Sequence, residues 1–146
     1  MSTPGERLKK PPFTTIDELK KRLTPFFHLP EVQLVVLFGS AASDSLRADS
    51  DLDFAILGDH VLDLVALTNM LISQLHCNHV DLVDLRRSSP VLMMEVARTG
   101  ALLFERTPGG YAAFCSLAHR RYVDTTKLRV AQKASIHRFL QARGLT

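Results

Sequence analysis

The sequence predicts a single α/β or α+β domain that contains one small sheet, followed by a helical C-terminal tail. Short β-branched and aromatic runs alternate with longer segments in which leucines recur at helical spacing. Glycines and prolines stand at the boundaries between these segments. The chain has 146 residues and is 46% hydrophobic, so one domain can bury a core without disulfide or metal support.

The N-terminal part of the chain is expected to form an arm, a helix and a buried strand. Residues 1–12 are polar and contain proline, which is typical of a loose arm. Thr15 followed by Glu18 is a capping-box pattern, and the helix that it starts is expected to end at two prolines. Residues 32–38 are β-branched or apolar and predict a strand that ends at Gly39.

Strands and helices then alternate through the middle of the chain. We expect strands at 51–57, 79–85 and 101–105, with an amphipathic helix at 61–76 between the first two. A second helix is expected at 90–99, because serines precede its first residue, which is proline, and a glycine follows its last. The domain is therefore expected to cover residues 13–110.

Residues 111–146 are expected to form a helical extension that packs on the same domain, since they have helical composition and no proline. From residue 120 onward this tail is distinctly basic, with Asp124 as its single acid. Its cations are Arg120, Arg121, Lys127, Arg129, Lys133, Arg138 and Arg143. Either the charges lie on a solvated helix face, or they face a partner or phosphate groups, and the sequence leaves both interpretations open.

Composition limits the class of protein. A net charge of +3 suits an anionic ligand such as a nucleotide, but it is too low for a surface that coats nucleic acid, so we expect no direct nucleic-acid binding. Cys77 and Cys115 lack the partners of a zinc site and are expected to be reduced. The N-terminus has no secretory signal and no apolar stretch approaches ~20 residues, so we expect a cytoplasmic protein without membrane association.

The chemistry is expected at the start of the second strand. Because strand side chains alternate, Asp51 and Asp53 point to one face while Leu52 points to the other. Two like charges this close are costly unless a hard cation neutralises them. Mg²⁺ binds carboxylate oxygens together with substrate phosphates, so the pair predicts a magnesium site.

A third carboxylate is expected from the strand at 79–85. Asp81 lies within its apolar stretch, whereas Asp84 has the opposite phase near the strand end, so strand phase favours Asp81 as a catalytic residue and metal ligand. Three carboxylates around Mg²⁺ would clamp a triphosphate and orient an acceptor hydroxyl for in-line attack on the α-phosphorus. Gly39 would let the backbone approach phosphate, and Ser40 would supply a hydroxyl to it.

A known family shares this arrangement of motifs. Gly39-Ser40, a spacer of ten residues, Asp51-Leu52-Asp53 and the strand with Asp81 together resemble the signature of the DNA polymerase β-like nucleotidyltransferase superfamily. The short length and the segments VDLVDL and RTGALLFER resemble its minimal branch, the MNT proteins, which act as antitoxins to HEPN-domain ribonucleases. The resemblance extends from about residue 13 to residue 122.

The resemblance implies a mixed small sheet flanked by helices, ATP as nucleotide donor, Mg²⁺ as cofactor, and transfer of AMP to a tyrosine of a HEPN toxin. Relatives commonly carry an arginine shortly after the Gly-Ser pair, where this chain has Ala42-Ser43-Asp44, and Arg47 is our candidate for binding the phosphates instead. Two alternatives remain, a toxin-binding antitoxin of the same fold without catalysis and transfer to a small-molecule hydroxyl.

Overall fold

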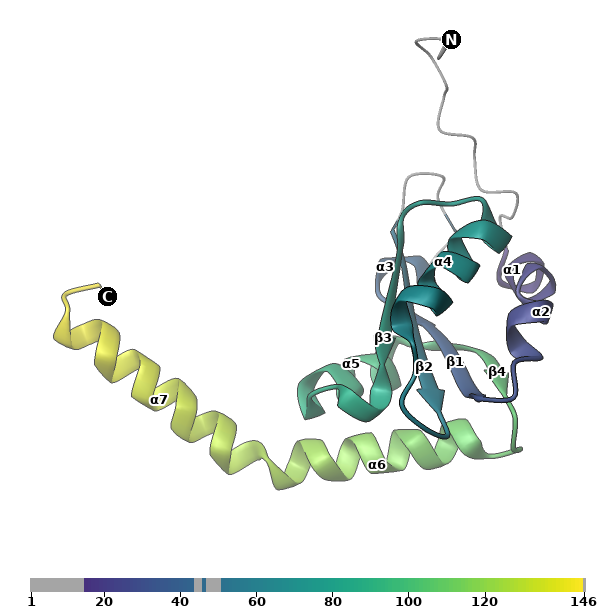
Figure 1. The fold of residues 1–146 in the computed structure, drawn as a ribbon. Helices are drawn as coiled ribbons and strands as arrows, with labels where there is room; N and C mark the ends of the chain where they lie inside the picture. The colour runs from purple at the N-terminus through teal and green to yellow at the C-terminus, as the bar shows by residue number, and fades with distance from the viewer. Residues whose placement is uncertain (1–14, 44–45, 47–50, 146) are drawn as a thin grey trace, which may run out of the picture.

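A four-stranded mixed sheet forms the centre of the protein (Figure 1). The structure is a computed structural model that describes residues 15–43, 46 and 51–145. The strand order is β3-β2-β1-β4, in which β1 pairs antiparallel with β2 and β4, and β2 pairs parallel with β3. The strands are β1 (Val32–Phe38), β2 (Leu52–Gly58), β3 (Val80–Asp84) and β4 (Ala101–Glu105). The predicted α/β class with a small mixed sheet is confirmed.

Helices cover both faces of the sheet, and each face has its own apolar core. The first face packs against α1 (Ile16–Arg22), α2 (Thr24–Phe27) and α4 (Leu64–Leu75). The second face packs against α5 (Pro90–Thr99) and α6 (Gly110–Asp124). Three further elements are α3 (Ser40–Ser43) after β1, the short 3₁₀ helix η1 (Leu85–Arg87) after β3, and the C-terminal α7 (Thr126–Ala142).

The first predicted helix is divided in two. Its start is as expected, because the Thr15 hydroxyl accepts a hydrogen bond from the Glu18 N–H at 3.2 Å. The helix ends earlier than predicted, at Arg22, and a second short helix begins at Thr24. Pro25 has no N–H for a continuous helix, but it is tolerated in the first turn of a new one. The proline therefore restarts the helix rather than only ending it.

The helix α4 begins three residues later than the predicted start at residue 61. Asp63 caps it by accepting a hydrogen bond from the Ala66 N–H at 3.1 Å, a cap that leucine periodicity alone does not reveal. The predicted apolar stripe does face the sheet, since Leu67, Leu71 and Leu75 are all buried.

Gly100, the residue directly after α5, has no space around it for a side chain. A Cβ atom at this position would lie 2.4 Å from the carbonyl oxygen of Val96 and 2.5 Å from a methyl group of Val36 on β1. The backbone at Gly100 is extended, with φ −71°. Glycine is therefore required at this position by close packing and not by a left-handed conformation.

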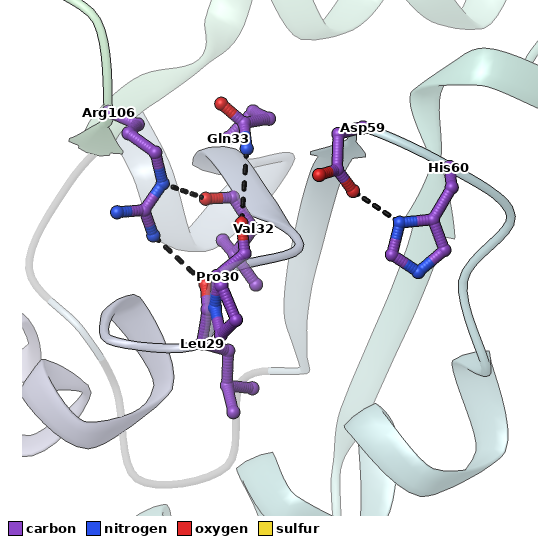
Figure 2. A network of polar contacts seen from close by, with 7 residues as sticks. All are labelled: Leu29, Pro30, Val32, Gln33, Asp59, His60 and Arg106. Carbon is purple, nitrogen blue, oxygen red and sulfur yellow. Dashed lines mark hydrogen bonds and ion pairs between the residues drawn. The ribbon is translucent and has the colours of Figure 1, made fainter.

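Arg106, directly after β4, joins the N-terminal helices to the sheet (Figure 2). Its Nε donates to the carbonyl oxygen of Val32 at 2.9 Å, and one terminal nitrogen donates to the carbonyl oxygens of Phe27 and Leu29 at 3.0 and 2.9 Å. These three carbonyl groups lie at the end of α2, in the following turn and at the start of β1. A single guanidinium therefore provides hydrogen-bond donors to three backbone oxygens where the chain passes from α2 to β1. Figure 2 also shows the neighbouring contact between Asp59 and His60.

The C-terminal extension consists of two helices that have different surroundings. Helix α6 packs on the second face of the sheet and buries Phe114 and Ala118. Helix α7, however, buries no residue and runs clear of the sheet from the end of α6 (Figure 1). The two helices separate at Thr125, whose hydroxyl bonds to the carbonyl oxygens of Arg121 and Tyr122, a local contact that competes with a continuous helix.

Two expectations lie outside the described residues. They are the loose arm at residues 1–12 and the placement of Arg47. Within the described part of the chain, no helix is long and apolar enough to cross a membrane.

Candidate active site

The site begins where β1 ends, at Gly39. This glycine has φ +76°, a left-handed conformation that side chains disfavour. A Cβ atom at this position would also lie 2.7 Å from a carboxylate oxygen of Asp53. Gly39 is therefore needed for a reason that the sequence did not reveal, which is to make room for the carboxylate of the next strand. Ser40 follows directly as the first residue of α3.

The strand register brings Asp53 and Asp81 together. Asp53 on β2 is the partner of Asp81 on the parallel strand β3, and on its other side it is the partner of Phe38 on β1. Residues in register on neighbouring strands point to the same face of a sheet and lie about 5 Å apart. The two carboxylates are thus neighbours at the end of the sheet where β1 ends and the chain turns at Gly39.

Asp51 lies one residue before β2 and is more exposed than Asp53. One of its carboxylate oxygens is 3.5 Å from Nδ1 of His79, and the side chains of the two residues are 69% and 50% exposed. The contact follows from the parallel register, because the N–H of Leu52 donates to the carbonyl oxygen of His79 at 2.8 Å. Sequence reasoning assigned His79 no part in the site, although its position directly before β3 was the available signal.

The electrostatics of the site reflect its unneutralised charge. Partial burial raises the pKa of Asp53 above its ordinary value, and the neighbouring charges of Asp81 and then Asp51 raise the pKa further. Asp81 and Asp51 therefore both act on Asp53 through space.

This donor set fits Mg²⁺ in its chemistry, because it offers hard carboxylate oxygens and a local excess of negative charge. Among the described residues, no three His, Cys, Asp or Glu side chains converge as a closed metal site. Mg²⁺ does not need such a cage, since it is commonly held by one or two carboxylates and completes its octahedron with water and substrate phosphates. The open arrangement of Asp53 and Asp81 is consistent with that mode of binding.

Asp84 has a different environment from Asp81. Asp84 is buried, at 6% exposure, and one of its carboxylate oxygens accepts a hydrogen bond from the Arg86 N–H at 2.9 Å. It therefore caps the 3₁₀ helix that follows β3, whereas Asp81 is exposed beside Asp53. These environments give Asp84 a structural role, and the choice of Asp81 as catalytic residue and metal ligand stays a prediction.

The site and fold match a known enzyme family. A family model described as polymerase beta, nucleotidyltransferase matches residues 21–108, which is more than half of the chain and contains all of the carboxylates described above. The chain belongs to this nucleotidyltransferase family. The resemblance found in the sequence motifs is thereby confirmed.

Relatives within this family are similar over nearly the whole chain. The protein adenylyltransferase MntA of Aphanizomenon flos-aquae is 30% identical, over 94% of this chain and 98% of that protein. A solved complex of the tri-AMPylated Shewanella oneidensis HEPN toxin with its MNT antitoxin contains a chain that is 30% identical, with a TM-score of 0.65, over 84% of this chain and 95% of that one. A toxin-antitoxin structure with AMP-PNP gives 29% identity and a TM-score of 0.67, over 84% of this chain and 98% of that one.

Proposed function

We propose that this protein transfers AMP from ATP to a tyrosine of a HEPN-domain toxin and so acts as its antitoxin, in a reaction that depends on Mg²⁺. The observation that carries the proposal is the register of β2, which places Asp53 between the Gly39 turn and Asp81 in a nucleotidyltransferase fold. The acceptor is proposed from similarity to the adenylyltransferase MntA, which extends over 94% of the chain.

In this proposal the carboxylates Asp51, Asp53 and Asp81 hold Mg²⁺, which would offset the charge of the triphosphate and of the transition state. Gly39 lies against Asp53 and is followed by Ser40, and both are proposed to contact the phosphates, with Arg47 as a further candidate. The tyrosine oxygen attacks the α-phosphorus, the bond to the bridging oxygen of the β-phosphate breaks, and pyrophosphate leaves. Asp81 is the proposed acceptor of the tyrosine proton, because its exposed carboxylate lies on the neighbouring strand.

The test uses the purified chain and the HEPN-domain protein that is proposed as its partner. Incubation with ATP and Mg²⁺ is expected to raise the intact mass of the toxin by one or more AMP groups, and peptide mapping is expected to place them on tyrosine. Asp53→Asn is expected to lower the rate by at least about a hundredfold, since loss of a direct ligand should exceed the 10- to 100-fold cost of losing an outer-shell partner. Omission of Mg²⁺ should have a comparable effect.

The alternatives give different results in the same assay. If the toxin is silenced without nucleotide and Asp53→Asn silences it equally well, the protein acts by contact alone. If AMP appears on an added small-molecule hydroxyl but never on the toxin, the acceptor is not a protein. Either result would require the proposal to be withdrawn.

A further inference from the structure

Helix α7 is built like a packed helix but has nothing packed on it. It has 17 residues, of which none is buried, although it carries several large apolar side chains. Val130 is 64% exposed and Ile136 is 60% exposed. An apolar stripe of this kind in open solvent is a mark of an interaction surface.

Val130, Ile136 and Leu140 lie on one side of α7, which we call the α7 docking face, whereas Leu128 and Phe139 are exposed outside it. Each of its members has another member three or four residues away, as neighbours on a helix surface do, and together they line a shallow, open hollow. They are Val130, Lys133, Ala134, Ile136, His137 and Leu140. The face therefore combines an apolar centre with a cation.

Charge limits what can cover this face. Residues 126–142 contain four cations, Lys127, Arg129, Lys133 and Arg138, and no acid. None of the ion pairs within the described residues involves α7. A second copy of the chain would bring an equal positive charge to the same face, which electrostatics disfavours. The complementary partner is a protein whose apolar surface is bordered by carboxylates.

The junction at the base of α7 holds the helix in one direction. The guanidinium of Arg129 donates to the carbonyl oxygen of Tyr122 at 2.6 Å and lies 3.8 Å from the centre of the Tyr122 ring. It also donates to the hydroxyls of Thr125 and Thr126. A helix that is fixed before binding loses less conformational entropy when a partner docks.

Helix α6, from which α7 continues, packs on the face of the sheet toward which Asp53 points. Asp53 has the same strand phase as Ala55, and Ala55 packs in one apolar cluster with Phe114 of α6. Helix α7 continues from the end of α6 and runs clear of the domain (Figure 1).

We propose that the α7 docking face binds an apolar, carboxylate-bordered surface of the protein that receives AMP. The identity of this partner rests on the proposed function, whereas the surface itself rests on the exposure and charge of α7. Docking would hold the acceptor tyrosine near the site and supply orientation that this small domain does not provide by itself.

The experiment uses calorimetry to measure the dissociation constant of the complex between the 146-residue chain and its proposed HEPN-domain partner, without ATP or Mg²⁺. Val130→Glu places a charge in the centre of the face and is expected to raise the dissociation constant by about tenfold or more. Ser135→Glu is the matched control, because it adds the same charge to an exposed position off the face and should change the constant by no more than about twofold. Lys133→Glu should lower the association rate and weaken its dependence on salt.

The outcomes separate docking from catalysis. Asp53→Asn is expected to bind as tightly as the wild type, because docking precedes the chemistry. If Val130→Glu loses binding while no variant and no wild type transfers AMP, the proposed function fails and the docking proposal stands. If transfer occurs but Val130→Glu binds as tightly as Ser135→Glu, the docking proposal is overturned. It is also overturned if sedimentation shows a wild-type dimer that Val130→Glu converts to monomer.

Discussion

Helices α4 and α7 both carry large apolar side chains, yet only one of them belongs to the core. In α4, 12 residues long, Leu67, Leu71 and Leu75 are buried against the sheet. In α7, 17 residues long, no side chain is buried. The stripe of α4 is covered by its own chain, whereas that of α7 meets only solvent within the described structure. An apolar stripe therefore shows that a surface is meant to be covered, but it does not show what covers it.

This difference separates two tasks of the chain. The sheet and its helices hold Asp53 one strand spacing from Asp81 on one side and from the end of β1 at Gly39 on the other, which requires a rigid core. The arm formed by α7 contributes nothing to that core and is available for another protein. Substitutions in the sheet and its packed helices should consequently change stability and AMP transfer. Substitutions in α7 should change the affinity for the partner protein.

The largest expected effect tests the core side of the comparison. Leu71→Ala removes a fully buried side chain from α4 and is expected to lower the free energy of unfolding by about 2–5 kcal/mol. Val130→Ala in α7 is expected to change it by no more than about 0.5 kcal/mol, because Val130 is 64% exposed. Urea denaturation of both variants measures the difference. Equal losses would show that α7 packs on the domain in solution.

A second pair distinguishes chemistry from structure within a single strand. Asp81→Asn is expected to lower AMP transfer by at least about a hundredfold, because its carboxylate faces Asp53. Asp84→Asn should retain transfer, while Asp84→Ala should lower stability by about 1 kcal/mol through loss of the cap on Arg86. Labelled-ATP assays and thermal melts report the two effects. The opposite ranking in the transfer assay would show that strand phase assigns the wrong carboxylate.

The smallest expected effect concerns the charge of the site without metal. The folded-state pKa of Asp53 is raised above its ordinary value of 3.8, so ionised Asp53 destabilises the fold at pH values above the raised pKa. The penalty is absent below the ordinary pKa, where Asp53 is protonated in both states. Asp53→Asn should therefore melt slightly higher than the wild type at pH 7 in EDTA, and this advantage should vanish as the pH falls below about 3.8. An advantage that persists at low pH would have a cause other than charge.

The sequence by itself determined the strands, the alternation of elements and the carboxylate motif. Side-chain alternation is a local property of a strand, so the residue order alone was enough to predict that Asp51 and Asp53 share a phase and that Asp81 and Asp84 do not. That Asp81 lies beside Asp53 was decided by the register of β2 and β3. The start of α1 at Thr15 could also be assigned, because a capping hydrogen bond joins residues only three positions apart.

Tertiary structure decided the features that depend on distant parts of the chain. The need for glycine at position 39 comes from Asp53 on the next strand, and the contact of Asp51 with His79 comes from the parallel register of β2 and β3. The separation of α7 from the domain likewise cannot be read from its composition, which is as helical as that of α6. Periodicity specifies which side of a helix is apolar, but burial depends on whether another surface lies within reach, and only the three-dimensional arrangement of the chain supplies that surface.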